Sequence, residues 1–321
     1  MKIDMFTHLI TPRFMDIISK RIPFPNGRPV PLWDLEQRFR IMDKFEDYVQ
    51  VLTFPQPAIE AVAEHKDAVE LARLGNDELS EIITRHPDRF IAGVANLPIN
   101  DVEASLKETD RAIKDLGLKG ILIHTNINGK PLDSPEFMPL YEKMAQYDLP
   151  IWIHPRRDNT VADYSTESES KYFIHGSLGW PYETQLAMTR LVCNGVLEKY
   201  PNLKFITHHC GGGIPFFGDR IAGFLNTFRK RDPDSSLGRL TKEPVEQLRM
   251  FYGDTAIGGS TPALDCGYAF FGAEHIIFGS DMPYGPEHGI GEAITAVTEM
   301  AISDSDKKKI FEDNARRLLG V

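Results

Sequence analysis

Histidines and aspartates stand at the ends of short apolar runs in this sequence. His8 follows KIDMFT, His154 follows LPIWI, and Asp281 follows HIIFGS. Imidazole nitrogens and carboxylate oxygens are common protein ligands of Zn²⁺. If these residues meet in the folded chain, they predict a divalent metal site that could polarise a substrate oxygen or activate a water molecule. Zn²⁺ is the first expectation because the donors are rich in nitrogen.

Other polar residues follow further apolar runs and leave alternatives open. His208 and His209 are adjacent after LKFIT, so on a strand their side chains point to opposite sides. We therefore expect only one of them to face a shared site, where a histidine could move protons at neutral pH. His124 follows KGILI and could serve the site or bond a loop carbonyl. Asp254 could hold a turn or orient a histidine.

Two arginines, Arg156 and Arg157, come directly after His154. A guanidinium group can hold a carboxylate by two parallel hydrogen bonds. Arg156, Arg157 and His124 are therefore candidate substrate-binding residues. The alternative is that at least one arginine is a surface residue or a salt-bridge partner.

Eight β-rich runs carry these residues: 2–8, 47–54, 89–98, 119–125, 149–155, 203–209, 250–256 and 275–281. Most are near-continuous apolar runs, which are typical of strands covered on both faces, and helical patterns lie between them. This alternation predicts parallel strands with right-handed crossovers. Eight units favour an α/β fold with one distorted (β/α)8 TIM barrel over residues 1–321. An open doubly wound sheet is the alternative, weakened because no GxGxxG follows the first run.

Two insertions interrupt the alternation of strands and helices. Residues 20–46 begin Pro-rich and end in a short amphipathic helical pattern, and residues 156–180 follow the fifth strand. Both would lie on the C-terminal face of a barrel, where the active sites of such barrels are found. Loops of this length are typical of lids or subunit contacts.

Composition excludes some classes of partner. The net charge is −10, with 36 Lys and Arg against 46 Asp and Glu, which argues against nucleic acid or an anionic membrane but permits a small anionic substrate. The three cysteines form no CxxC pair, as expected in a reducing compartment. No apolar stretch reaches the roughly 18–20 residues of a membrane span, and no signal-peptide pattern is present. We therefore expect a cytoplasmic protein.

The segments WIHPRR, KFITHHCGGGIPF, FGSDMPYGPE and KIFEDNARRLLG, together with KIDMFTH, resemble the amidohydrolase superfamily. More narrowly, they resemble its amidohydrolase-2 group, which includes aminocarboxymuconate-semialdehyde decarboxylase and γ-resorcylate decarboxylase. The resemblance runs over nearly the whole chain. It implies a barrel enzyme. Members of the group are mostly metal-dependent C–C lyases, whereas relatives hydrate or hydrolyse unsaturated and aromatic acids. It also suggests a homodimer or higher homo-oligomer.

The resemblance implies a role for each matching residue. His8, His154 and Asp281 match metal ligands, and Asp281 thereby belongs to the catalytic centre. His209 matches the histidine that moves a proton to or from the substrate, because it precedes x-Gly-Gly with Pro215 six residues on. The departure is Phe6, which stands where the group usually has a first ligand. Three ligands remain, so Zn²⁺ or Mn²⁺ should bind more weakly and be partly lost on purification.

Three functions follow as hypotheses. The leading one is a metal-dependent decarboxylase of a hydroxylated aromatic or conjugated unsaturated carboxylic acid, with His209 delivering a proton to carbon. The second is a hydrolase that attacks a C–C, ester or amide bond with metal-activated water. The third is a non-catalytic barrel that has lost its metal site at Phe6.

Overall fold

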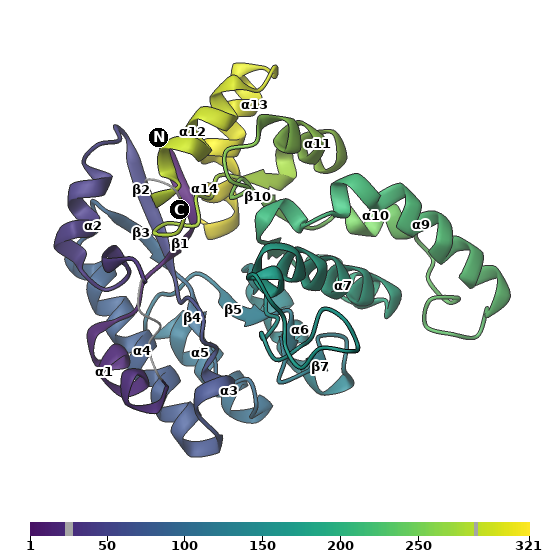
Figure 1. Ribbon diagram of the computed structural model, residues 1–321, viewed down its shortest axis with the longest axis horizontal. Helices are drawn as coiled ribbons and strands as arrows, with labels where there is room; N and C mark the ends of the chain where they lie inside the picture. Colours follow the sequence, from purple (N-terminus) through teal and green to yellow (C-terminus); the bar gives the residue numbers. More distant parts are fainter. Residues whose placement is uncertain (23–27, 286–287) are drawn as a thin grey trace.

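The protein is a parallel α/β barrel in the computed structural model, which describes residues 1–22, 28–285 and 288–321 (Figure 1). A three-stranded sheet has the order β1-β2-β3, and a six-stranded sheet has the order β11-β10-β9-β8-β5-β4. The strands are β1 (Lys2–His8), β2 (Tyr48–Thr53), β3 (Phe90–Gly93), β4 (Ala95–Asn96), β5 (Ile121–His124), β8 (Ile151–His154), β9 (Phe205–Thr207), β10 (Tyr252–Asp254) and β11 (Ile276–Ile277). They fall within the eight predicted runs, since only Val94 separates β3 from β4.

The two sheets also meet at a seam between β1 and the segment after β11. Thr7 pairs with Met282 in an isolated parallel bridge. The backbone N–H of Met5 donates to the carbonyl of Phe278 at 2.9 Å, and that of His8 donates to the carbonyl of Met282 at 2.7 Å. These bonds join the first strand to the last, which confirms the barrel over the open sheet.

Helices surround the strands (Figure 1). They are α1 (Pro12–Arg21), α2 (Leu35–Met42), α3 (Ile59–Val62), α4 (His65–Arg85), α5 (Val102–Lys114), α6 (Met138–Tyr147), α7 (Trp180–Cys193), α8 (Val196–Lys199), α9 (Ile214–Arg231), α10 (Pro244–Leu248), α11 (Thr261–Phe271), α12 (Ile290–Glu299), α13 (Asp304–Lys308) and α14 (Asn314–Leu319). A short antiparallel hairpin, β6 (Asn126–Ile127) with β7 (Lys130–Pro131), follows β5. No helix in the described ranges is long and apolar enough to cross a membrane.

A compact apolar cluster is built from residues of the strands, with one helix added. Ile3, Val51, Leu122, Trp152 and Ile206 all belong to it and are essentially inaccessible to solvent. Apolar residues of α14 pack into the same cluster: Ala315, Leu318 and Leu319. The interior of the barrel is therefore packed with side chains of the described strands.

The described parts of both insertions follow β1 and β8, the first and fifth strands of the barrel, although residues 20–21 end α1 and Trp180 begins α7. In the first, α2 confirms the short amphipathic helix, whose Ile41 and Met42 are buried. Residues 23–27 of that insertion lie outside the described residues. The second insertion runs without strand or helix from Pro155 to Phe173, then forms a π-helical turn at His175–Gly179 that leads into α7.

A buried carboxylate, Asp4, fastens the seam of the barrel. Its Oδ1 accepts backbone N–H groups from Phe6 at 3.2 Å and Ser280 at 3.0 Å. Its Oδ2 accepts the hydroxyls of Tyr48, at 2.6 Å, and Ser280. Burial raises the pKa of Asp4 to about 6, whereas these hydrogen bonds act in the opposite direction.

We expect Asp4→Asn to keep the fold and Asp4→Ala to weaken it. The asparagine oxygen can accept both backbone N–H groups, and its NH₂ group can donate to the two hydroxyls, which accept as well as donate. Alanine leaves two buried N–H groups unpaired, and each unpaired group costs about 1–3 kcal/mol. Urea unfolding of the two variants at pH 7 measures the difference, and equal stabilities would contradict this account.

The Asp4→Asn variant also tests the pKa of Asp4. Because its pKa in the folded state lies near 6, above the ordinary 3.8, the folded chain binds more protons between these values. This contribution to the wild-type free energy of unfolding therefore falls as the pH rises from about 4 to 6. The stability of Asp4→Asn, measured relative to wild type, should rise over that interval.

Candidate metal and proton-transfer site

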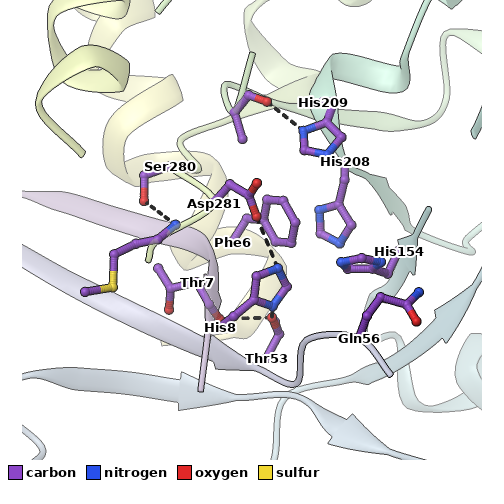
Figure 2. A network of polar contacts seen from close by, with 12 residues as sticks. Phe6, Thr7, His8, Thr53, Gln56, His154, His208, His209, Ser280 and Asp281 are labelled. Atoms are coloured by element: carbon purple, nitrogen blue, oxygen red, sulfur yellow. Dashed lines mark hydrogen bonds and ion pairs between the residues drawn. The ribbon is translucent and has the colours of Figure 1, made fainter. Parts of the chain in front are cut away.

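Four strand ends bring the predicted site residues together (Figure 2). His8 ends β1, His154 ends β8, His208 follows β9, and Asp281 lies beyond β11. His8 Nε2 lies 3.2 Å from Asp281 Oδ1, and the ring centroids of His8 and His154 are 5.2 Å apart. The mouth of the barrel therefore collects residues that are far apart in the sequence.

Hydrogen bonding fixes which edge of the His8 ring faces Asp281. Thr53 Oγ1 donates to the carbonyl of Thr7 at 2.9 Å and lies 3.0 Å from His8 Nδ1. Since the Thr53 hydroxyl hydrogen is used, its oxygen accepts from His8 Nδ1–H. Neutral His8 would then point a lone pair at a carboxylate oxygen. This contact is favourable only with a proton or a cation between the two atoms.

His154 and His208 are held in the same way, each by its Nδ1 atom. His154 Nδ1 lies 2.7 Å from the carbonyl oxygen of Pro155, which can only accept, and His208 Nδ1 lies 3.1 Å from Asp254 Oδ2. Burial lowers the pKa of both imidazoles well below the usual range. Both rings are therefore neutral at pH 7, with Nε2 available as a donor of electrons. Asp254 thus orients a histidine, and it also accepts from two backbone N–H groups in the turn after β9 and β10.

The structure corrects the expectation that only one of His208 and His209 faces the mouth. The centroids of both rings lie near the Phe6 ring, at 3.3 Å for His208 and 5.9 Å for His209. Strand alternation ends here because His209 has φ +55°. His209 is half-buried, and its Nδ1 lies 2.7 Å from the carbonyl oxygen of Ala256, so its Nε2 edge is the one left for chemistry.

Phe6 lies among the imidazoles (Figure 2). It is fully buried, stacks on His208 and meets the His8 ring edge-on with centroids 4.7 Å apart. A phenyl ring offers no lone pair to a cation. The first strand therefore contributes one donor, His8, to this group.

The side chains at the mouth fit a divalent cation in kind. They are buried imidazoles with outward-bonded Nδ1 atoms, a carboxylate beside His8 Nε2, and a buried His208 Nε2 without a partner. Outward bonds of this type are the usual support of histidine ligands. Across residues 1–22, 28–285 and 288–321, no group of three or more His, Cys, Asp or Glu side chains lies in an arrangement that could hold a metal ion. His8, His154 and Asp281 therefore match a divalent cation in donor type, but their side chains are not arranged around a common point.

The predicted substrate-binding residues are held by acidic partners. Arg156 pairs with buried Glu60 at 3.3 Å, and Arg157 pairs with Glu183 at 3.2 Å. His124 Nδ1 lies 3.7 Å from the same Glu60 oxygen. Burial, with the charge of Arg156, lowers the pKa of His124 to about 3. Both arginines are therefore salt-bridge partners in this structure, as the alternative allowed.

Sequence reasoning missed three residues near the mouth. Glu60, in the short helix after β2, has its pKa raised to about 7 by burial. Tyr284 lies 5.8 Å from His8, centroid to centroid, and burial raises its pKa to about 12. Gln56 donates to the carbonyl of Pro155 at 3.2 Å. Tyr284 had a readable signal, since it stands three residues beyond Asp281, and both line one small pocket. The other two had none.

The chain is similar over most of its length to several characterised proteins. The family model described as Amidohydrolase matches residues 3–321. Gamma-resorcylate decarboxylase from Polaromonas sp. (strain JS666) is 31% identical over 88% of this chain and 86% of its own. 2-Amino-3-carboxymuconate-6-semialdehyde decarboxylase from Dictyostelium discoideum is 29% identical over 90% of this chain and 77% of its own. The crystal structure of a dihydroxybenzoic acid decarboxylase from Polaromonas sp. JS666, with bound manganese and the inhibitor 2-nitroresorcinol, matches with a TM-score of 0.84 at 27% identity, covering 99% and 96% of the two chains.

We expect Thr53→Val to weaken divalent metal binding by about 10–100-fold, the usual cost of removing a partner behind a histidine ligand. Valine has the shape of threonine but cannot accept from His8 Nδ1–H. Thr53→Ser, which keeps the hydroxyl, is the matched control and should bind normally. Titration calorimetry with Zn²⁺ on chelator-treated protein measures both. Equal affinities for the two variants would show that His8 is not a ligand.

Proposed function

This chain belongs to the amidohydrolase family, and on that premise we propose that it is a metal-dependent decarboxylase of hydroxylated aromatic or conjugated unsaturated carboxylic acids. The observation that carries the proposal is the 31% identity to a gamma-resorcylate decarboxylase over 88% of the chain. The gathering of His8, His154, His209 and Asp281 at one end of the barrel supports it.

The ion would be held by His8, His154 and Asp281. Bound there, a divalent metal would act as a Lewis acid on the substrate carboxylate or an adjacent oxygen. Two neutral imidazole donors favour Zn²⁺ over harder ions. Mn²⁺ is the alternative, because it is the ion in the related dihydroxybenzoic acid decarboxylase.

His209 would carry the proton. Its Nδ1–H donates to the Ala256 carbonyl, which also stabilises the ring when Nε2 is protonated. From Nε2 the proton passes to the substrate carbon that bears the carboxylate, and a new C–H bond forms. The C–C bond to the carboxylate then breaks, CO₂ leaves, and the electron pair of that bond restores the conjugated system. The half-buried position of His209 allows it to regain a proton from solvent.

The substrate carboxylate or hydroxyl would meet Arg156 and His124, with Arg157 beside them. Arg156 Nε and His124 Nε2 are buried atoms without hydrogen-bond partners. A guanidinium group has five donors, so Arg156 can bind an oxyanion while it stays paired with Glu60. These two atoms are therefore the best-placed contacts for a substrate oxygen on this side of the mouth.

His209→Asn should lower the rate of CO₂ release by about 100- to 10,000-fold, the usual range for removing a general acid. Wild type and variant are incubated with hydroxylated benzoic acids and conjugated unsaturated acids in the presence of Zn²⁺ or Mn²⁺. His275→Asn is the control, because His275 precedes β11 at the other end of that strand. Full activity of His209→Asn would contradict the assignment of the proton donor.

Labelled water separates the decarboxylase from the hydrolase of the same family. A hydrolase incorporates ¹⁸O from solvent into its organic product, whereas direct decarboxylation places a solvent hydrogen, and no oxygen, on the product carbon. Mass spectrometry of the product in H₂¹⁸O therefore decides between the two. A metal-loaded, folded protein that converts none of the acids would contradict the decarboxylase proposal.

We also infer a homodimer or higher homo-oligomer in a reducing, cytoplasmic compartment. Helix α9 extends away from the barrel in Figure 1, and Phe216, Phe224 and Phe228 on it are more than half exposed. Such a patch is typical of a subunit contact. The three cysteines are free thiols, as a reducing compartment requires. Sedimentation of the Phe224→Asp/Phe228→Asp variant should show dissociation to monomers, and an unchanged sedimentation coefficient would contradict the contact.

A further inference from the structure

His208 is a buried residue that the proposed reaction does not use. Its side chain is fully inaccessible, and its Nε2 has no hydrogen-bond partner. Leaving a buried polar atom unpaired costs about 1–3 kcal/mol. Native structures rarely retain such an atom without a reason, such as an ion that binds there.

The other edge of the His208 ring is firmly held. Asp254 Oδ2 accepts from Nδ1, and Asp254 Oδ1 is fixed by the backbone N–H groups of Cys210, at 3.2 Å, and Ala256, at 3.0 Å. The side chains of His208 and Asp254 are both fully buried. A histidine backed by a carboxylate is the common arrangement for a metal ligand, because the carboxylate fixes the tautomer and raises the basicity of Nε2.

His208 lies beside Phe6, the residue that stands at the place of a metal ligand but has no atom that can bind a metal. Its ring stacks on Phe6 at an interplanar angle of 18°, with centroids 3.3 Å apart, and its centroid lies 5.2 Å from that of His154. His8 and His154 are separated by the same 5.2 Å. An imidazole from β9 therefore stands directly beside the phenyl ring that β1 supplies.

We propose that His208 is a ligand of the divalent ion and replaces the donor that Phe6 cannot provide. The donor set would then be His8, His154, His208 and Asp281, three imidazoles and one carboxylate, and a substrate oxygen would have to bind as a fifth ligand, a coordination number that catalytic Zn²⁺ can reach. The inference rests on the proposed metal site. It adds that this chain has moved one ligand from the first strand to the end of β9, and that its nitrogen-rich set binds Zn²⁺ more tightly than Mn²⁺.

A double-mutant cycle tests this exchange, with Zn²⁺ affinity as the readout. The variants are His208→Phe, Phe6→His and the swap Phe6→His/His208→Phe, in which one phenyl and one imidazole still stack. His208→Phe should bind Zn²⁺ at least about 100-fold more weakly, which exceeds the usual cost of losing a supporting group. The swap should recover at least about tenfold of that loss. His275→Phe, outside the mouth, should bind like wild type.

The coupling between the two positions carries the conclusion. If His208 is a ligand, Phe6→His improves Zn²⁺ binding far more in the His208→Phe background than in wild type. Additive effects, or normal Zn²⁺ affinity in His208→Phe, would overturn the inference. Circular dichroism and thermal melting of the metal-free variants establish that each one folds. Wild-type protein that binds no Zn²⁺ would overturn both this inference and the proposed metal site. The readout throughout is Zn²⁺ affinity and not catalytic activity.

Discussion

The geometry of the mouth depends on how the barrel is fastened between its first and last strands. β11 has only two residues of regular strand, so its ladder contributes little to the closure. The buried Asp4 carboxylate reinforces the backbone bonds of this seam, because it accepts from β1, β2 and the backbone of Ser280 at once. Ser280 precedes Asp281, and the N–H of Asp281 donates to the carbonyl of Phe6 at 3.0 Å. The 3.2 Å approach of His8 to Asp281 follows from this fastening.

Oriented imidazoles are the second physical principle of the site. Each of His8, His154, His208 and His209 has its Nδ1 atom against a fixed acceptor. Two acceptors are backbone carbonyls, one is a threonine hydroxyl and one is a carboxylate. The protein thereby determines the tautomer of every ring before any ligand arrives. The four Nε2 atoms differ in surroundings: three belong to buried rings, whereas His209 remains partly open and suits a proton that must be replenished.

Much of this arrangement could be predicted from the sequence, because strand ends meet in a barrel and His8, His154 and Asp281 stand at such ends. Phe6 and His8 are two residues apart on β1, a spacing that puts both side chains on one face of the strand. Two features could not be predicted. The left-handed backbone of His209 breaks the alternation that would have sent His208 and His209 to opposite sides. The pairing of Arg156 with Glu60 and of Arg157 with Glu183 depends on contacts across the fold, which no local pattern records.

The packing of α14 against the strands bears on how the protein is made. Ala315, Leu318 and Leu319 fill one cluster with Ile3 and Met5, and the amino group of Met1 lies 3.2 Å from Glu312. A ribosome delivers Ile3 some three hundred residues before these leucines. During that interval the nascent first strand lacks both its covering helix and its neighbour β11. Elongation alone therefore cannot complete the mouth, and the apolar side chains of β1 lack their full cover until synthesis has passed residue 319.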